Sequence, residues 1–156
     1  DAVVISDYCK GFLTEDEISY ISNQHTNTFL DTKKSINNWA SNINFIKINE
    51  VELDHSIGFL HDNEGEFSKK VITTLGSKGA QYQGIKYPVD KVDVRDTSGA
   101  GDTFMAGLVY AYITHIYGSF DEQIHTAIKF ANKCSTQVVQ KKGTAKVNLK
   151  QLKYEV

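Results

Sequence analysis

Short apolar runs alternate with segments of helical periodicity along most of the chain, and this alternation constrains the fold more than any other feature. Runs of strand length lie at residues 2–6, 28–31, 45–48 and 71–74. Between them, apolar residues recur at the three- and four-residue spacing of an amphipathic helix. Strands that alternate with helices in this way are typical of a parallel sheet covered by helices. The sequence therefore predicts an α/β fold.

Helix start signals support this fold class. Thr14 to Glu17 and Ser119 to Glu122 have the capping-box spacing, in which a hydroxyl residue precedes a glutamate by three positions. This arrangement satisfies two backbone amides at a helix N-terminus. A further helix is expected after Asn49, with Val51 and Leu53 on its inner face.

Two long helices are predicted in the C-terminal third. The first covers residues 101–117 and is apolar on so wide a face that it should be almost engulfed. Its apolar rows are Phe104, Leu108, Tyr112 and Ile116, and Met105, Val109 and Ile113. The second starts at Ser119 and is expected to reach Lys141 and Lys142, with Gly143 ending it. The two helices should pack as a hairpin.

The remaining segments are predicted as edge strands and loops. Two short strands, at 80–83 and 91–95, lie on either side of the single proline, Pro88, and are expected to pair antiparallel near a sheet edge. Residues 37–44 and 61–70 are expected to be loops.

Composition indicates one ordinary globular domain, residues 1–156, with 40% hydrophobic and 23% charged residues. The net charge of -2 and the scattered basic residues argue against nucleic acid or an anionic membrane as partner. No apolar run reaches the roughly 18 residues of a membrane span. Cys9 and Cys134 lack metal-site or redox-motif spacing, which favours two buried, unpaired thiols in the cytoplasm. The histidines also lack zinc spacing, and His115 and His125 are expected at the surface.

Residues 96–102, with the sequence DTSGAGD, lie between a strand and a strongly predicted helix. Their small side chains let backbone amides converge at a helix N-terminus, which favours an anion. A carboxylate at Asp102 is suited to accept a proton from a hydroxyl that attacks a phosphoryl group. The alternative is that Asp102 only complements the helix dipole and the glycines only make a turn. The spacing is neither that of a P-loop nor that of a Rossmann fingerprint.

The DTSGAGD segment resembles the DTxGAGD signature of the pfkB, or ribokinase-like, family of carbohydrate kinases. Three further segments resemble family motifs in the same order. Asn49 to Glu52 is similar to the NxxE motif, and Thr74 to Gly79 is similar to the TLGxxG turn. Lys142 to Thr144, after the helix that carries Asn132, is similar to the closing nucleotide loop. Taken alone, each companion is more typical of a structural role: Asn49 of a helix N-cap, Glu52 of a solvated helix residue, and Thr74 to Gly79 of a tight turn between strands.

The resemblance implies a kinase that uses ATP and Mg²⁺ and has a three-layer, mostly parallel sheet. Asp102 would be the catalytic base, with the backbone amides of Gly99, Ala100 and Gly101 as the anion hole for the γ-phosphate. The remaining family contacts would fall on Asn49 and Glu52 (Mg²⁺ and phosphate, through water), Thr74, Gly76 and Gly79 (nucleotide phosphates and ribose), Asn132 (adenine), and Asp96, Ser98 and Gly143 (a monovalent cation, K⁺).

A second resemblance concerns the substrate. Residues 6–11, SDYCKG, and 31–33, DTK, are similar to the SDYxKG and DPK segments of the heptose 7-phosphate kinase branch. Asp7, Lys10 and Lys33 would then face a phosphorylated sugar, since ammonium groups attract phosphate. The alternative is a polar turn that leads to the cap at Thr14.

Members of this family carry a longer N-terminal portion with a small β lid, which the chain lacks, so the resemblance implies an N-terminally truncated fold. Two hypotheses of different classes follow. The chain is the ATP-binding half of a sugar kinase, expected to have little or no activity by itself even if it binds nucleotide, or it is an incomplete nucleotide-binding fragment or interaction module. A homo-oligomer, or completion by a missing N-terminal half, would supply the remaining surface.

Overall fold

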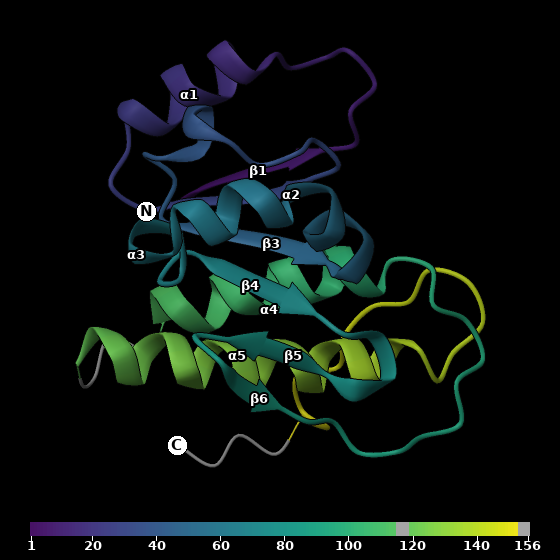
Figure 1. Cartoon of the computed structure of the whole chain (residues 1–156). Coiled ribbons are helices and arrows are strands. Elements are labelled where there is room, and N and C mark those ends of the chain that lie inside the picture. Colours follow the sequence, from purple (N-terminus) through teal and green to yellow (C-terminus); the bar gives the residue numbers. More distant parts are fainter. Residues whose placement is uncertain (115–118, 153–156) are drawn as a thin grey trace. The chain divides into compact units, whose positions relative to one another are not determined.

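The structure is a computed structural model that describes residues 1–114 and 119–152. These residues form two compact units, and each is described by itself (Figure 1). Unit 1 comprises residues 1–76 and 80–86, and unit 2 comprises residues 77–79 and 87–156. In the described ranges, no helix is long and apolar enough to cross a membrane.

A six-stranded sheet in sequence order, β1 to β6, organises unit 1 (Figure 1). The first four strands are parallel, and β5 is antiparallel to β4. The strands are β1 (Val3–Asp7), β2 (Thr28–Thr32), β3 (Phe45–Asn49), β4 (Val71–Thr74), β5 (Ala80–Tyr82) and β6 (Ile85–Tyr87). The prediction of an α/β fold with a mostly parallel sheet is confirmed.

The helices of unit 1 connect the parallel strands. They are α1 (Glu15–Asn23), the 3₁₀ turn η1 (Asn38–Ala40), α2 (Glu50–Asp62) and α3 (Glu64–Phe67). The capping box predicted at Thr14 is present, because Thr14 accepts from the Glu17 amide (3.2 Å) and Glu17 accepts from the Thr14 amide (2.8 Å). Hydrogen bonds from the Thr14 amide and hydroxyl lower the pKa of Glu17. A further 3₁₀ turn, η2 (Gly76–Lys78), follows β4.

One face of the sheet in unit 1 carries a hydrophobic core cluster. Side chains alternate along each strand, so Leu30, Ile46 and Ile48 lie on the same face and are completely buried. They pack in one cluster with Ile18 of α1 and with Trp39. The segment 37–44, predicted as a loop, is therefore a folded part of the core that contains η1.

A helical hairpin organises unit 2. It consists of α4 (Ala100–Thr114) and α5 (Phe120–Val138), and the capping box predicted at Ser119 starts the second helix. The helices approach so closely that a Cβ at Gly107 would lie 3.0 Å from the Cys134 sulfur. Burial raises the pKa of the Cys134 thiol to about 11. The predicted hairpin is confirmed, whereas Ile116 lies outside the described residues.

Three predictions about local structure were wrong. Val51 is 62% exposed, because the start of α2 turns Glu52 inward instead. The strand expected at 91–95 is absent there, and β6 forms earlier because Gln83 and Gly84 adopt positive φ (49° and 75°), which suits a tight hairpin. Helix α5 ends at Val138 rather than near Lys142.

Other residues lie in different surroundings from those predicted. Cys9 is exposed, not buried, and has positive φ (54°) in the loop after β1. His125 is half-buried and hydrogen-bonds through Nδ1 to the hydroxyl of Tyr87. Residues 61–70 are not a plain loop, because they include the end of α2 and all of α3. His115 lies outside the described residues.

Candidate active site

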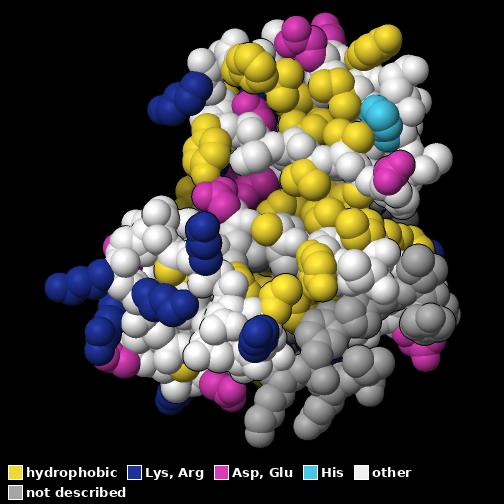
Figure 2. Space-filling model, turned by 180° about the vertical axis from the view of Figure 1, so that it is seen from behind, with side chains coloured by type: hydrophobic (Ala, Val, Ile, Leu, Met, Phe, Trp, Pro, Cys, Tyr) yellow, Lys and Arg dark blue, Asp and Glu magenta, His cyan; other side chains and the backbone are white. Residues whose placement is uncertain are grey.

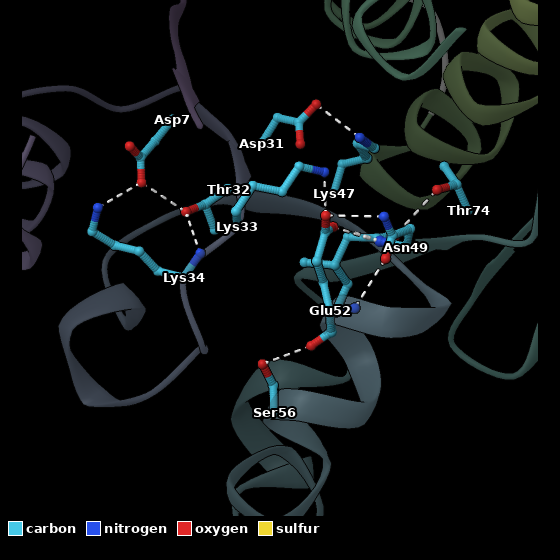
Figure 3. A network of polar contacts seen from close by, with 11 residues as sticks. Asp7, Asp31, Thr32, Lys33, Lys34, Lys47, Asn49, Glu52, Ser56 and Thr74 are labelled. Carbon is cyan, nitrogen blue, oxygen red and sulfur yellow. Dashed lines mark hydrogen bonds and ion pairs between the residues drawn. The ribbon is translucent and has the colours of Figure 1, made fainter. Parts of the chain in front are cut away.

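The carboxyl ends of the parallel strands in unit 1 carry a network of polar side chains (Figure 3). Asp7 ends β1, Lys33 follows β2, Asn49 ends β3 and Thr74 ends β4. Because these strands are parallel, their carboxyl ends lie at one edge of the sheet, where ligands of open α/β folds bind. The predicted positions Asp7, Lys33, Asn49, Glu52 and Thr74 thus belong to a single edge.

Asp7 is buried and uses both carboxylate oxygens within the chain. Oδ2 accepts from the Thr32 hydroxyl (2.9 Å) and the Lys34 ammonium (2.8 Å), and Oδ1 accepts from the Cys9 amide (3.0 Å). Burial by itself would raise the pKa of Asp7, but these hydrogen bonds from Lys34, Cys9 and Thr32 lower it overall. Asp7 therefore anchors the loop after β1.

Lys34 completes this anchor and was not identified from the sequence. Its ammonium also donates to the carbonyl of Leu13 (2.9 Å), and the hydrogen bond to Asp7 raises the pKa of Lys34. The predicted substrate residue Lys10 lies exposed in the anchored loop, between Cys9 and Gly11, both of positive φ. In the sequence, only its position next to the candidate residue Lys33 could have indicated Lys34.

Asn49 and Glu52 form a reciprocal cap at the start of α2. The Asn49 side-chain oxygen accepts from the Glu52 amide (2.9 Å), and Glu52 Oε2 accepts from the Asn49 amide (2.8 Å). Glu52 Oε1 also accepts from Asn49 Nδ2 (2.9 Å) and forms an ion pair with Lys33. The Glu52 carbonyl accepts from the hydroxyl of Ser56 (3.0 Å), which in turn accepts from the Ile36 amide (2.9 Å). The predicted metal-network pair is a rigid unit.

A buried ion pair lies on the sheet face that carries Lys33 and Asn49. Lys47 Nζ is 2.7 Å from Asp31 Oδ2, and the two residues are directly paired between β2 and β3. Asp31 lies two positions before Lys33, and Lys47 lies two positions before Asn49. Because side chains alternate along a strand, the members of each such pair point to the same face of the sheet. Sequence reasoning missed this pair, because it depends on the register of two strands.

Thr74 and Gly76 mark the end of β4. The Thr74 hydroxyl donates weakly to the Ile48 carbonyl (3.3 Å), which ties β4 to β3. Gly76 has φ of 56°, a conformation that glycine adopts without strain, and is exposed. Both predicted nucleotide residues therefore lie at the carboxyl edge.

In unit 2, the Asp96 carboxylate joins two loops. Oδ1 accepts from the Ser98 amide (2.8 Å), and Oδ2 accepts from the Gly143 amide (2.9 Å). These hydrogen bonds, with that to Ser98 the larger effect, lower the pKa of Asp96. The carbonyl of Val139 accepts from the amides of Arg95 (2.8 Å) and Asp96 (3.2 Å) just beyond α5. The structure thus brings together Asp96, Ser98 and Gly143, the three residues expected at a monovalent cation.

The DTSGAGD turn presents backbone amides at the start of α4. Gly99 has φ of 76°, its carbonyl accepts from the Thr103 amide (2.9 Å), and the Ala100 amide donates to Thr97 (3.1 Å). In the described part of the chain, the amides of Gly99 and Gly101 donate to no backbone carbonyl. Asp102 follows in the first turn of α4 and is exposed. Two of the three predicted amides therefore remain available for an anion.

Gly79 and Asn132 both act on the backbone of Tyr87. A Cβ at Gly79, whose φ is 92°, would lie only 2.0 Å from the Tyr87 carbonyl oxygen. The same oxygen accepts from the side-chain amide of Asn132 (2.8 Å), and burial raises the pKa of the Tyr87 hydroxyl. These two predicted nucleotide residues thus have a structural task within unit 2.

Residues 2–151 match the pfkB family of carbohydrate kinases, so the chain belongs to this family. This places it among the sugar and nucleoside kinases of the ribokinase type. Within the described residues, no cluster of three or more His, Cys, Asp or Glu side chains could hold a metal ion by itself.

Among curated relatives, the chain is 29% identical over 168 residues to the bifunctional protein HldE of a Nitratiruptor species. The alignment covers 97% of the chain but 35% of that relative, so the chain spans about a third of the length of the curated relatives it matches.

Solved structures confirm the ribokinase-like fold. An aminoimidazole riboside kinase from Salmonella enterica, complexed with aminoimidazole riboside and an ATP analogue, is 23% identical, with a TM-score of 0.62 over 81% of this chain and 50% of that one. A fructokinase double mutant from Vibrio cholerae, bound to fructose, ADP and potassium ion, is 22% identical, with a TM-score of 0.61 over 81% of this chain and 48% of that one.

Proposed function

We propose that this chain supplies the ATP-binding and phosphoryl-transfer part of a kinase that acts on a hydroxyl of a sugar or sugar phosphate. The observation that carries the proposal is the turn before α4, where two available amides and the Asp102 carboxylate lie within one short segment. Family membership supports the reaction class.

The proposed chemistry divides between the amides and the carboxylate. Amides of Gly99 and Gly101 at the helix N-terminus stabilise the negative charge on the transferring phosphoryl group. The Ala100 amide, bonded to Thr97, orients the turn. Asp102 accepts the proton of the attacking hydroxyl, so that the oxygen becomes nucleophilic as the bond to phosphorus forms.

The residues at the carboxyl edge of unit 1 fit Mg²⁺ held through water and phosphate. Glu52 brings a buried carboxylate in a rigid cap with Asn49, while the described residues offer no complete set of protein ligands. This suits Mg²⁺, which keeps several waters and binds through one or two carboxylates and substrate phosphates. When bound, Mg²⁺ would neutralise charge on the phosphates. Thr74 and Gly76 would lie along those phosphates.

The remaining predicted residues concern the adenine of the nucleotide and a K⁺ ion. Asn132 would border the adenine while its amide holds Tyr87, and Gly79 would keep the same backbone close. Asp96, Ser98 and Gly143 would shape a loop for K⁺, the ion bound in the fructokinase relative. The already low pKa of Asp96 keeps a negative charge there.

Heptose 7-phosphate is the proposed acceptor, because the HldE relatives and the SDYCKG and DTK segments point the same way. Lys10 is exposed and Lys33 is 41% exposed, so both ammonium groups can reach a phosphate. Asp7 contributes by holding the loop that carries Lys10.

We also propose that the chain contacts a further polypeptide or a second copy of itself, and that it is located in the cytoplasm. Hydrophobic side chains, yellow in Figure 2, are exposed at the surface in view, and the exposed large hydrophobic residues of unit 1 include Val4 (47%), Tyr8 (54%) and Phe12 (87%). Exposed apolar surface favours contact with a further polypeptide or a second copy. A cytoplasmic location would supply ATP to the site.

The test measures ADP binding by calorimetry and ATP turnover with heptose 7-phosphate, ribose and fructose 6-phosphate as acceptors. The 156-residue chain and a longer form that carries an N-terminal half of the family are compared in the same buffer, each with its Asp102→Asn variant. Equal ADP affinity with turnover lost in the variant supports the proposal. Little or no turnover is expected of the 156-residue chain by itself, whereas binding without turnover by the longer form favours the alternative, a nucleotide-binding fragment. Absence of ADP binding refutes the proposal.

A further inference from the structure

The negative charge of Glu52 is buried and is balanced by Lys33. The carboxylate is 5% exposed, and both of its oxygens accept hydrogen bonds from donors of the chain. The two donors from Asn49 are neutral, whereas the ammonium of Lys33 forms an ion pair with Oε1. A buried carboxylate without a counter-charge is costly, so the ion pair with Lys33 stabilises Glu52 in its buried position.

The two members of this pair differ in how firmly they are held. Glu52 is fixed by the reciprocal bonds with Asn49 at the start of α2, as Figure 3 shows. The side chain of Lys33 is 41% exposed and follows the last residue of β2. Its ammonium can therefore leave Glu52 and become fully hydrated while the rest of the side chain stays in place. Lys33 is therefore the member that can move.

We propose that Lys33 is a built-in counter-ion of Glu52 that competes with Mg²⁺ for this carboxylate. The inference rests on the proposed function, because it takes Glu52 as part of the Mg²⁺ and phosphate network. Both cations need the same negative charge, so Lys33 leaves Glu52 when Mg²⁺ is held beside it. Lys33 thus sets how much Mg²⁺ is needed to strengthen nucleotide binding, and it acts as a positioning residue rather than a catalytic one.

A purely structural tie between the end of β2 and α2 makes a different prediction. In that case, removal of Lys33 lowers stability and leaves the response to Mg²⁺ unchanged. Competition predicts that the response itself changes, because the empty carboxylate gains affinity for Mg²⁺. The Mg²⁺ dependence therefore separates the two roles.

The experiment uses the full chain and measures ADP affinity by calorimetry over a range of Mg²⁺ concentrations. In Lys33→Met, the Mg²⁺ concentration that gives half of the gain in affinity should fall about fivefold, as expected when one unit charge roughly 4 Å away is removed in a medium whose dielectric is close to that of water. Lys33→Arg keeps the charge and should behave as the wild type. Lys69→Met, at an exposed lysine of the same unit, is the matched control and should also leave the midpoint unchanged.

A second background tests whether the effect passes through Glu52. In Glu52→Gln, the further change Lys33→Met should leave the Mg²⁺ midpoint where it was, because the contested charge is gone. An equal shift in both backgrounds would overturn the inference, and so would an unchanged midpoint in Lys33→Met.

Thermal unfolding with Mg²⁺ alone separates this inference from the proposed function. Lys33→Met should have a lower melting temperature than the wild type without Mg²⁺ and should recover more of it as Mg²⁺ is added. ADP binding without this difference refutes only the competition. Absence of ADP binding by the wild type refutes the proposed function, and an equal Mg²⁺ response of melting temperature then refutes the competition as well.

Discussion

The anchor formed by Asp7 and Lys34 gives the sharpest stability prediction. Asp7→Asn keeps the shape of the side chain but removes its charge, and it leaves the Lys34 ammonium, whose side chain is 12% exposed, without its carboxylate. Removal of one partner of a buried ion pair costs about 3–5 kcal/mol. The carbonyl of Leu13 still accepts from Lys34, so we expect about 3 kcal/mol, the lower end of that range.

Chemical and thermal unfolding of the full chain test this value. A loss of about 3 kcal/mol corresponds to a fall in melting temperature of about 6–12 °C for a chain of this length. Asp54→Asn, at an exposed position of α2, is the matched control and should stay within about 0.5 kcal/mol of the wild type. The double variant Asp7→Asn/Lys34→Met should recover part of the loss, because it leaves no buried charge unpaired.

The pH dependence follows from the directions of the two pKa shifts. The pKa of Asp7 is lowered on folding, so its contribution is present above its unfolded pKa of about 3.9 and is lost as pH falls through the lower folded value. The pKa of Lys34 is raised, so its contribution is present below about pH 10.4 and is lost as pH rises through the higher folded value. A wild-type advantage that does not decrease as pH falls below about 3.9, or a variant as stable as the wild type at pH 7, would refute the anchor.

Three further predictions concern unit 2. In a longer form that carries an N-terminal half of the family, Asp102→Asn should lower kcat by about 10²–10⁴-fold with ADP affinity little changed, since it removes a proton acceptor; equal kcat in steady-state assays would exclude Asp102 as the base. Gly79→Ala should destabilise the chain by about 3 kcal/mol or more, because a Cβ would meet the Tyr87 carbonyl oxygen and φ is 92°. Gly65→Ala, where a Cβ would meet nothing within 4 Å, is its control in urea unfolding. Asp96→Asn should loosen the loops at Ser98 and Gly143, and hydrogen exchange of their backbone amides should become faster. In the wild type, the pKa of Asp96 is lowered, so its hydrogen bonds to these two amides should weaken only when pH falls below the ordinary pKa range of an aspartate.

Local signals in the sequence predicted much of the framework. The capping boxes at Thr14 and Ser119 formed as expected, because their partners lie three residues apart and need no tertiary contact. The four parallel strands also followed from their apolar runs. The motif resemblance led to the pfkB family, because DTSGAGD and its companions are continuous stretches of sequence.

Only the tertiary structure decided how the polar residues are paired. The sequence contained Asp7, Lys33 and Glu52 as candidates, but Asp7 pairs with Lys34 across 27 positions, and Lys33 pairs with Glu52 across 19. The buried pair of Asp31 and Lys47 exists because β2 and β3 meet in one particular register. Periodicity shows which residues share a face of one element, whereas the partner of a charge depends on how separate elements align. The sequence by itself determined most of the elements and the family and supplied the candidate reacting groups, and the alignment of the strands determined which charges are paired at the carboxyl edge of the sheet.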